Sequence, residues 1–127
     1  MKQRNPTWRR AYGLVLLALP LLLGLPAPAH AHAILVQSDP PSNATLPAGP
    51  TVFALRFNAR IDAERSRLTL LGADGSSRPL PQTPQTAPDS LGTTADLPPG
   101  EWRLRWQVLA VDGHITRGDI PLHVRAP

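Results

Sequence analysis

The chain contains no cysteine, and its only methionine is Met1. Disulfide bonds therefore cannot support the fold, and after the first residue no sulfur ligand is available for a soft metal ion. Lysine is also nearly absent, because Lys2 is the only one. The longest apolar run, Leu14–Leu25, is interrupted by Pro20. It falls short of the ~18 residues that a membrane-spanning helix needs.

The first 31 residues have the features of an export signal. Basic residues from Lys2 to Arg10 precede the apolar run, and small residues in an Ala-x-Ala pattern end at Ala31. The Arg9-Arg10 pair leaves the twin-arginine route open beside the general secretory route. We therefore expect a signal peptide over 1–31 and a periplasmic mature domain over 32–127, with no stable membrane insertion once the signal is removed.

A second cleavage position is present two residues earlier. Ala27-Pro28-Ala29 also fits the Ala-x-Ala pattern, and cleavage after Ala29 would leave His30-Ala31-His32 at the front of the mature chain. Pro28 next to the cut disfavours that position. Cleavage after Ala31 would instead make His32 the first residue.

Removal of the signal changes the charge balance. Lys2 and three arginines leave with residues 1–31, so nine arginines then stand against nine acidic residues. The arginines are scattered singly along the sequence and form no basic run of the kind that neutralises phosphates. Nucleic acid is therefore not an expected partner.

The mature sequence reads as short strands separated by turn residues, with no helical period. Glu101–Ala110 alternates most clearly, with Trp102, Leu104, Trp106 and Val108 on one face. Asp74-Gly75 predicts a hairpin turn, and residues 81–93 predict an irregular loop. Further strands are expected at 33–36, 51–57, 67–71, near 78–80, at 94–97 and at 119–125.

About seven strands with regular turns and twelve prolines in the mature chain indicate an all-β fold. We predict a small antiparallel Greek-key β-sandwich or barrel of immunoglobulin-like type. Trp102 and Trp106 are expected to dominate its core, because the chain has no cysteine to support it.

One loop and one chain end carry candidate metal ligands. Asp112-Gly113 follows the clearest strand, and on the simplest interpretation it is only a hairpin turn that His114 follows. However, His32 as a first residue would offer its amine and its ring to one metal, and an Asp-x-His loop can add an oxygen and a third nitrogen. Three nitrogens and an oxygen suit Cu(II). His123 alternates out of phase with its apolar neighbours, and we expect it on the solvent side.

These features resemble the CopC family of periplasmic copper-binding proteins. The resemblance covers the mature chain and is carried by these motifs: His32-Ala33-Ile34-Leu35, Ser38-Asp39-Pro40-Pro41, Leu55-Arg56-Phe57, and 100–106 leading to Asp112-Gly113-His114. It implies a cupredoxin-like sandwich and one Cu(II) per chain, bound by His32, Asp112 and His114. It also implies a role in copper resistance or homeostasis, as a carrier or buffer.

Two departures from the family pattern bear on the site. Where some members have an acidic residue near the copper, this chain has Asn58-Ala59, so a further carboxylate ligand is in doubt. The methionine-rich Cu(I) site of some members has no counterpart here. We expect a monomer whose copper partner, if it is a membrane copper-transport protein, is a separate chain.

Two rival functions remain open at this stage. A small histidine-brace copper oxidase or monooxygenase would also use an N-terminal histidine, although a carboxylate beside the copper would occupy the position of oxygen. A sandwich domain with a structural or adhesive role would need no metal. We expect a binding protein rather than an enzyme.

Overall fold

The computed structural model describes residue 24 and residues 32–127. The predicted signal peptide, His30 and the cleavage positions after Ala29 and Ala31 lie outside the described residues. Within the described part of the chain there is no helix, and hence none long and apolar enough to cross a membrane.

Eight strands make up the fold, and short turns connect most of them. In chain order they are β1 (Leu35–Asp39), β2 (Ala44–Pro47), β3 (Gly49–Phe57), β4 (Ile61–Gly72), β5 (Ser77–Leu80), β6 (Ser90–Leu97), β7 (Gly100–Ala110) and β8 (Ile115–Arg125). The fold class predicted from the sequence is confirmed.

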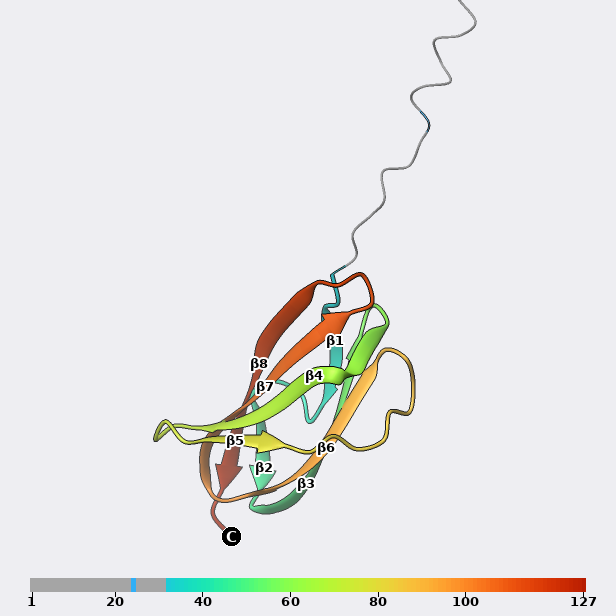
Figure 1. Ribbon diagram of the computed structural model, residues 1–127. Coiled ribbons are helices and arrows are strands. Elements are labelled where there is room, and N and C mark those ends of the chain that lie inside the picture. The colour runs from blue at the N-terminus through green and yellow to red at the C-terminus, as the bar shows by residue number, and fades with distance from the viewer. Residues whose placement is uncertain (1–23, 25–31) are drawn as a thin grey trace, which may run out of the picture.

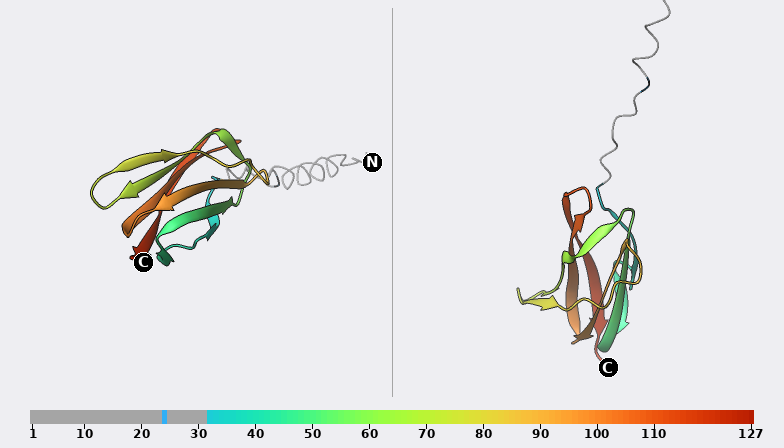
Figure 2. Two further views of the ribbon diagram at one scale, coloured as in Figure 1. Left: turned by 90° about the horizontal axis from the view of Figure 1, so that it is seen from below. Right: turned by 45° about the vertical axis from the view of Figure 1, so that its right-hand side comes forward.

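The strands form two sheets that pack face to face (Figures 1 and 2). One sheet has the order β1-β3-β6 and the other the order β2-β8-β7-β4-β5. The chain from residue 32 enters beside the turn that joins β7 to β8, and the C-terminus lies at the opposite end of the sandwich (Figure 1). The first described residues of the domain therefore lie close to the β7–β8 turn, and the C-terminus lies far from it.

The core follows from the period-two alternation of apolar residues. The long strands β3, β6, β7 and β8, and β4 beyond its bulge, contribute every second side chain over most of their length to the space between the sheets. The fully buried members include Phe53, Leu55 and Phe57 of β3, Leu68 and Leu70 of β4, Leu104 and Val108 of β7, and Ile120, Leu122 and Val124 of β8. Burial of each such side chain stabilises the fold by roughly 1.5–3 kcal/mol.

The two tryptophans differ in their burial. The ring of Trp106 is buried and meets Phe57 edge to face, with ring centroids 5.3 Å apart. Gly118 lies directly opposite on β8, where a Cβ atom would come within 2.5 Å of the indole. Trp102 is only partly buried at the edge of the core, and its indole N–H donates to the carbonyl of Pro98. The expectation that both rings dominate the core is therefore right for Trp106 alone.

Several strand limits differ from those predicted. β2 was not expected, and it pairs in parallel with β8, so the sandwich is not purely antiparallel. β6 begins at Ser90, inside the segment predicted to be irregular, because it pairs with β3 over its whole length. β1 is shifted toward the turn that follows it, and β8 begins four residues before the predicted start at Asp119.

No strand was predicted between 57 and 67, although β4 already begins at Ile61, and the structure gives the reason. The pairing of β4 with β7 shifts register between Asp62 and Arg67, which inserts a β-bulge. Ser66 in this bulge is fully buried, and its hydroxyl donates to the carbonyl of Asp62. The strand therefore continues on both sides of a segment that lacks the period of two.

Candidate metal centre

The turn between β7 and β8 holds Asp112 and His114 in place. Gly113 has φ +90°, a conformation that a glycine adopts without strain. The amide of Ala110 donates to the carbonyl of His114 at 2.8 Å, and the amide of Gly113 donates to the carbonyl of Ala110 at 2.9 Å. These two hydrogen bonds close the turn and so fix the backbone from which the side chains of Asp112 and His114 extend.

The carboxylate of Asp112 interacts with His114 in two ways. Its Oδ1 accepts a hydrogen bond from the backbone N–H of His114 at 3.0 Å, and its Oδ2 lies 3.2 Å from the Nδ1 of that ring. The backbone hydrogen bond from His114 is the main cause that lowers the pKa of Asp112, and the nearby charge of His32 adds to it. The group is therefore an ionised oxygen donor over the whole neutral range.

The first described residues of the domain are tied to the same end of the sandwich. Ala33 is fully buried, and its carbonyl accepts a hydrogen bond of 2.6 Å from the hydroxyl of Thr116 on β8. Ile34 and Asn58 bind each other reciprocally, since the Ile34 amide donates to Asn58 Oδ1 at 2.7 Å and the Asn58 amide donates to the Ile34 carbonyl at 3.0 Å. These contacts fix the backbone next to His32.

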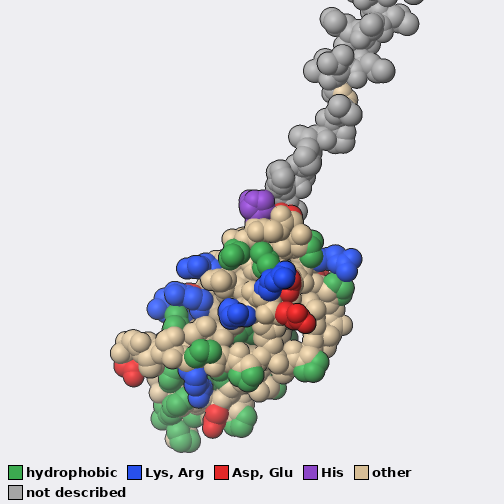
Figure 3. All heavy atoms as spheres, viewed as in Figure 1, with side chains coloured by type: hydrophobic (Ala, Val, Ile, Leu, Met, Phe, Trp, Pro, Cys, Tyr) green, Lys and Arg blue, Asp and Glu red, His purple; other side chains and the backbone are tan. Residues whose placement is uncertain are grey.

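As a result, the three predicted ligands are neighbours at one end of the molecule. The ring centroids of His32 and His114 are 4.8 Å apart, with an interplanar angle of 88°. The side chain of Asp112 is 28% exposed and that of His114 is 48% exposed. Figure 3 shows histidine side chains gathered at this end, where solvent can reach them.

The side chains of His32, Asp112 and His114 do not yet point to one common metal position. Among residues 24 and 32–127, no three or more His, Asp or Glu side chains form a group that could hold a metal ion as they stand. The two rings meet edge to face, and Asp112 is engaged by His114. The donor types themselves, two imidazoles and a carboxylate, fit Cu(II).

Asn58 and Thr116 hold the backbone beside the candidate ligand His32, and the sequence did not predict this role. Asn58 was considered only as a replacement for an acidic ligand, yet its side chain holds the Ile34 backbone. Thr116 gave no signal in the sequence, because its partner is 83 residues away. His123 lies on the solvent side as predicted, and its Nδ1 contacts Glu101 on β7.

Taken together, these features define a small all-β domain with two histidines and a carboxylate exposed at the end where the chain enters. A family model described as the CopC domain matches residues 35–125. The chain therefore belongs to the CopC family.

Relatives and solved structures agree with this assignment. Protein YobA of Escherichia coli (strain K12) is 29% identical over 99 residues, covering 75% of this chain and 80% of YobA. Copper transport protein CutJ of Bacillus subtilis (strain 168) is 24% identical over 126 residues, covering 96% of this chain but 22% of CutJ.

Two solved structures share the fold. CopC from Methylosinus trichosporium OB3b superposes with a TM-score of 0.65 at 25% identity, covering 75% of this chain and 95% of that protein. PcoC, a methionine-rich copper resistance protein from Escherichia coli, has a TM-score of 0.60 at 25% identity, covering 75% of this chain and all of PcoC. The single methionine of the present chain contrasts with the methionine-rich PcoC.

Proposed function

We propose that this protein is an exported Cu(II) carrier or buffer that acts in copper resistance or homeostasis. One Cu(II) ion per chain is bound by the α-amine and ring of His32, the carboxylate of Asp112 and the ring of His114. The amine becomes available when the signal peptide over 1–31 is removed after Ala31. The domain over 32–127 then works in the periplasm.

The observation that carries this proposal is the proximity of His32 and His114. Their rings lie 4.8 Å apart although they come from opposite ends of the domain sequence, and Asp112 lies beside His114. Rotation of the exposed side chains about their own torsions is a small change compared with movement of the backbone. Copper binding therefore needs side-chain rearrangement at a site whose backbone is already fixed by Ala33, Thr116 and the turn.

The family also supports copper as the cargo. CutJ is named a copper transport protein and PcoC a copper resistance protein. Nitrogen and carboxylate donors, together with the absence of sulfur ligands after Met1, favour Cu(II) over Cu(I). We further propose that the exposed site exchanges copper with a separate membrane copper-transport protein, and that the carrier itself is a monomer.

The direct test is Cu(II) affinity, measured by competition with a coloured chelator. Two versions of the domain are compared, one that begins at His32 and one that carries a single glycine before it. The added glycine moves the free amine while every side chain stays in place. Because loss of groups that only orient a ligand already lowers metal affinity by roughly 10–100-fold, loss of the amine is expected to lower it by more than about 100-fold.

His123→Ala is the matched control, because it removes a histidine at the opposite end of β8. It is expected to leave Cu(II) affinity unchanged. Equal affinity of the two N-terminal versions would show that the amine is not a ligand. Absence of Cu(II) binding by either version would refute the carrier function, and reductant-dependent peroxide production by the copper-loaded protein would favour an oxidase instead.

A further inference from the structure

The outer face of the five-stranded sheet concentrates positive charge at its centre. Arg67 of β4, Arg103 and Arg105 of β7, and Arg117 of β8 alternate out of phase with the buried residues of their strands. Residues that lie opposite one another on β4, β7 and β8 point to the same face of the sheet. Figure 3 shows several Lys and Arg side chains over the face in view, most of them between its centre and its left edge. We call this set of four side chains the arginine face.

The strand register shows how these charges are ordered. Gln107 lies directly between Arg67 and Arg117, and in the next row Arg105 lies between Thr69 and Asp119. Since neighbouring strands are about 4.8 Å apart, the backbones of the two outer residues of each row are about 10 Å apart. Four arginines therefore share a surface a few strands wide.

Asp119 neutralises only part of this charge. Arg105 binds its carboxylate in a fork, with Nε 2.8 Å from Oδ1 and Nη2 3.0 Å from Oδ2, and Arg103 adds a contact of 2.8 Å to Oδ2. Among the described residues, no carboxylate lies within ion-pair distance of Arg67 or Arg117. Their guanidinium groups instead donate to uncharged oxygens of the backbone or of Gln107.

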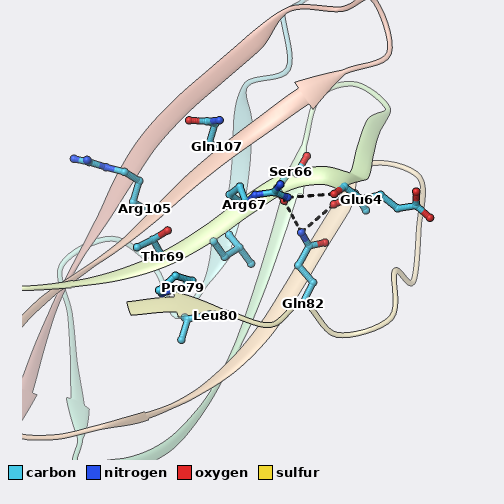
Figure 4. Close-up of a pocket in the computed structure, with 11 residues that line it drawn as sticks. Glu64, Ser66, Arg67, Thr69, Pro79, Leu80, Gln82, Arg105 and Gln107 are labelled. Carbon is cyan, nitrogen blue, oxygen red and sulfur yellow. Dashed lines mark hydrogen bonds between the residues drawn. The ribbon is translucent and has the colours of Figure 1, made fainter. Parts of the chain in front are cut away.

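A hollow lies beside the uncompensated end of the face. Its volume is about 650 Å³, which is in the range of small-ligand sites. Figure 4 shows Arg67, Thr69, Gln82, Arg105 and Gln107 around it. The lining also contains apolar residues, among them Pro79 and Leu80, and one carboxylate, Glu64, whose side chain points away from Arg67 in Figure 4. The hollow therefore combines unpaired positive charge with apolar surface.

We propose that the arginine face docks an acidic segment of a partner protein, with a carboxylate bound between Arg67 and Arg117 and apolar side chains of the segment resting in the hollow. The internal fork of Arg105 on Asp119 shows that this face already recognises a carboxylate. Guanidinium groups bind carboxylates through paired hydrogen bonds, which gives orientation as well as affinity. The surface lies on the outer face of the sheet, whereas the candidate ligands His32 and His114 lie at the end of the sandwich that holds the β7–β8 turn, and the proposal does not depend on copper.

A protein partner fits this face better than other polyanions. Single-stranded nucleic acid is held by aromatic platforms as well as charge, and none of the described residues that line the hollow is aromatic. A membrane surface would require a flat cluster of basic residues flanked by exposed apolar groups, whereas this face is concave beside Arg67.

The test measures binding of a fluorescent acidic peptide of repeated Glu, Asp and Leu to the metal-free domain, at low salt and at about 150 mM salt, where the Debye length is about 8 Å. The double variant Arg67→Gln/Arg117→Gln is compared with Arg56→Gln/Arg78→Gln. The control pair removes the same charge from exposed arginines elsewhere, each of which donates a single hydrogen bond to an uncharged oxygen, as Arg117 does. Circular dichroism checks that all variants fold.

The first double variant is expected to weaken peptide binding at least about tenfold, while the control pair changes it less than about threefold, because charge-assisted contacts act at short range. A counterpart peptide with Gln and Asn is expected not to bind. Equal losses in the two double variants, failure of the acidic peptide to bind, or tighter binding of phosphatidylglycerol vesicles or an oligonucleotide would each overturn the proposal.

Discussion

Replacement of Thr116 by valine is expected to weaken Cu(II) binding although Thr116 touches no metal. Its hydroxyl donates to the carbonyl of Ala33 at 2.6 Å and so fixes the backbone next to His32. Valine keeps the shape of the side chain and removes only the donor. The fully buried Ala33 would then lose its hydrogen-bond partner.

The size of the effect follows from the burial of that carbonyl. Leaving a buried acceptor without a partner costs about 1–3 kcal/mol. Without this hydrogen bond the backbone beside His32 shifts, and part of the free energy of copper binding is used to return His32 to its position. At 1.4 kcal/mol per factor of ten, the full cost corresponds to a loss of Cu(II) affinity between about fivefold and about 150-fold. The free energy of unfolding should decrease by the part of this cost that the metal-free domain does not relieve by a backbone shift, so the two losses together are about 1–3 kcal/mol.

Chelator competition measures the copper affinity, and urea unfolding of the metal-free domain measures the stability. Thr116→Ser is the matched control, because serine keeps the hydroxyl, and it should bind nearly as tightly as the natural protein. If Thr116→Val lowers stability but leaves Cu(II) affinity unchanged, then this hydrogen bond does not position His32, and the reasoning is refuted.

Three further predictions concern stability and pH. Gly118→Ala should lower the free energy of unfolding by about 1–3 kcal/mol, because its Cβ would come within 2.5 Å of Trp106; unchanged urea unfolding would show that the ring moves aside freely. The hydrogen bonds from Arg105 lower the pKa of Asp119 below its ordinary value of 3.8, so the stability this carboxylate adds is complete above that pH and is lost as pH falls through the lowered value. Asp119→Asn should therefore reduce stability at neutral pH but not at strongly acid pH, and parallel acid-unfolding curves would contradict this. Finally, Cu(II) affinity should fall as pH decreases from about 8 to about 5, because protons compete for the α-amine and imidazole donors, and a flat profile measured with a pH-independent competitor would exclude an amine ligand.

The alternation of apolar residues was sufficient to predict the central strands. From Phe53 to Phe57 in β3 and from Leu104 to Ala110 in β7 every second residue is buried, as the period of two requires. β2 could not be found in this way, because its four residues become a strand only by pairing in parallel with the distant β8. The bulge in β4 concealed its first half for a similar reason, since a shift in register interrupts the period.

The sequence reveals the proposed copper ligands more readily than the residues that hold the backbone beside them. His32, Asp112 and His114 stand out by their chemistry and by the family resemblance, and the structure places them together. The roles of Asn58 and Thr116 depend on which backbone groups come within reach, and ordinary polar residues give no signal of that. Similarly, arginines scattered singly along the chain form a common face only once β4, β7 and β8 are paired.

The hydrogen bond between Ala33 and Thr116 joins residues that are 83 positions apart in the sequence. A site assembled across such a separation exists only when the whole domain has folded, because an unfolded chain holds His32 and His114 far apart. Copper would then bind the native state almost exclusively and stabilise it by mass action, with each tenfold rise of free Cu(II) above the dissociation constant adding about 1.4 kcal/mol. The cargo would thus protect its own carrier against unfolding, most strongly when copper is abundant.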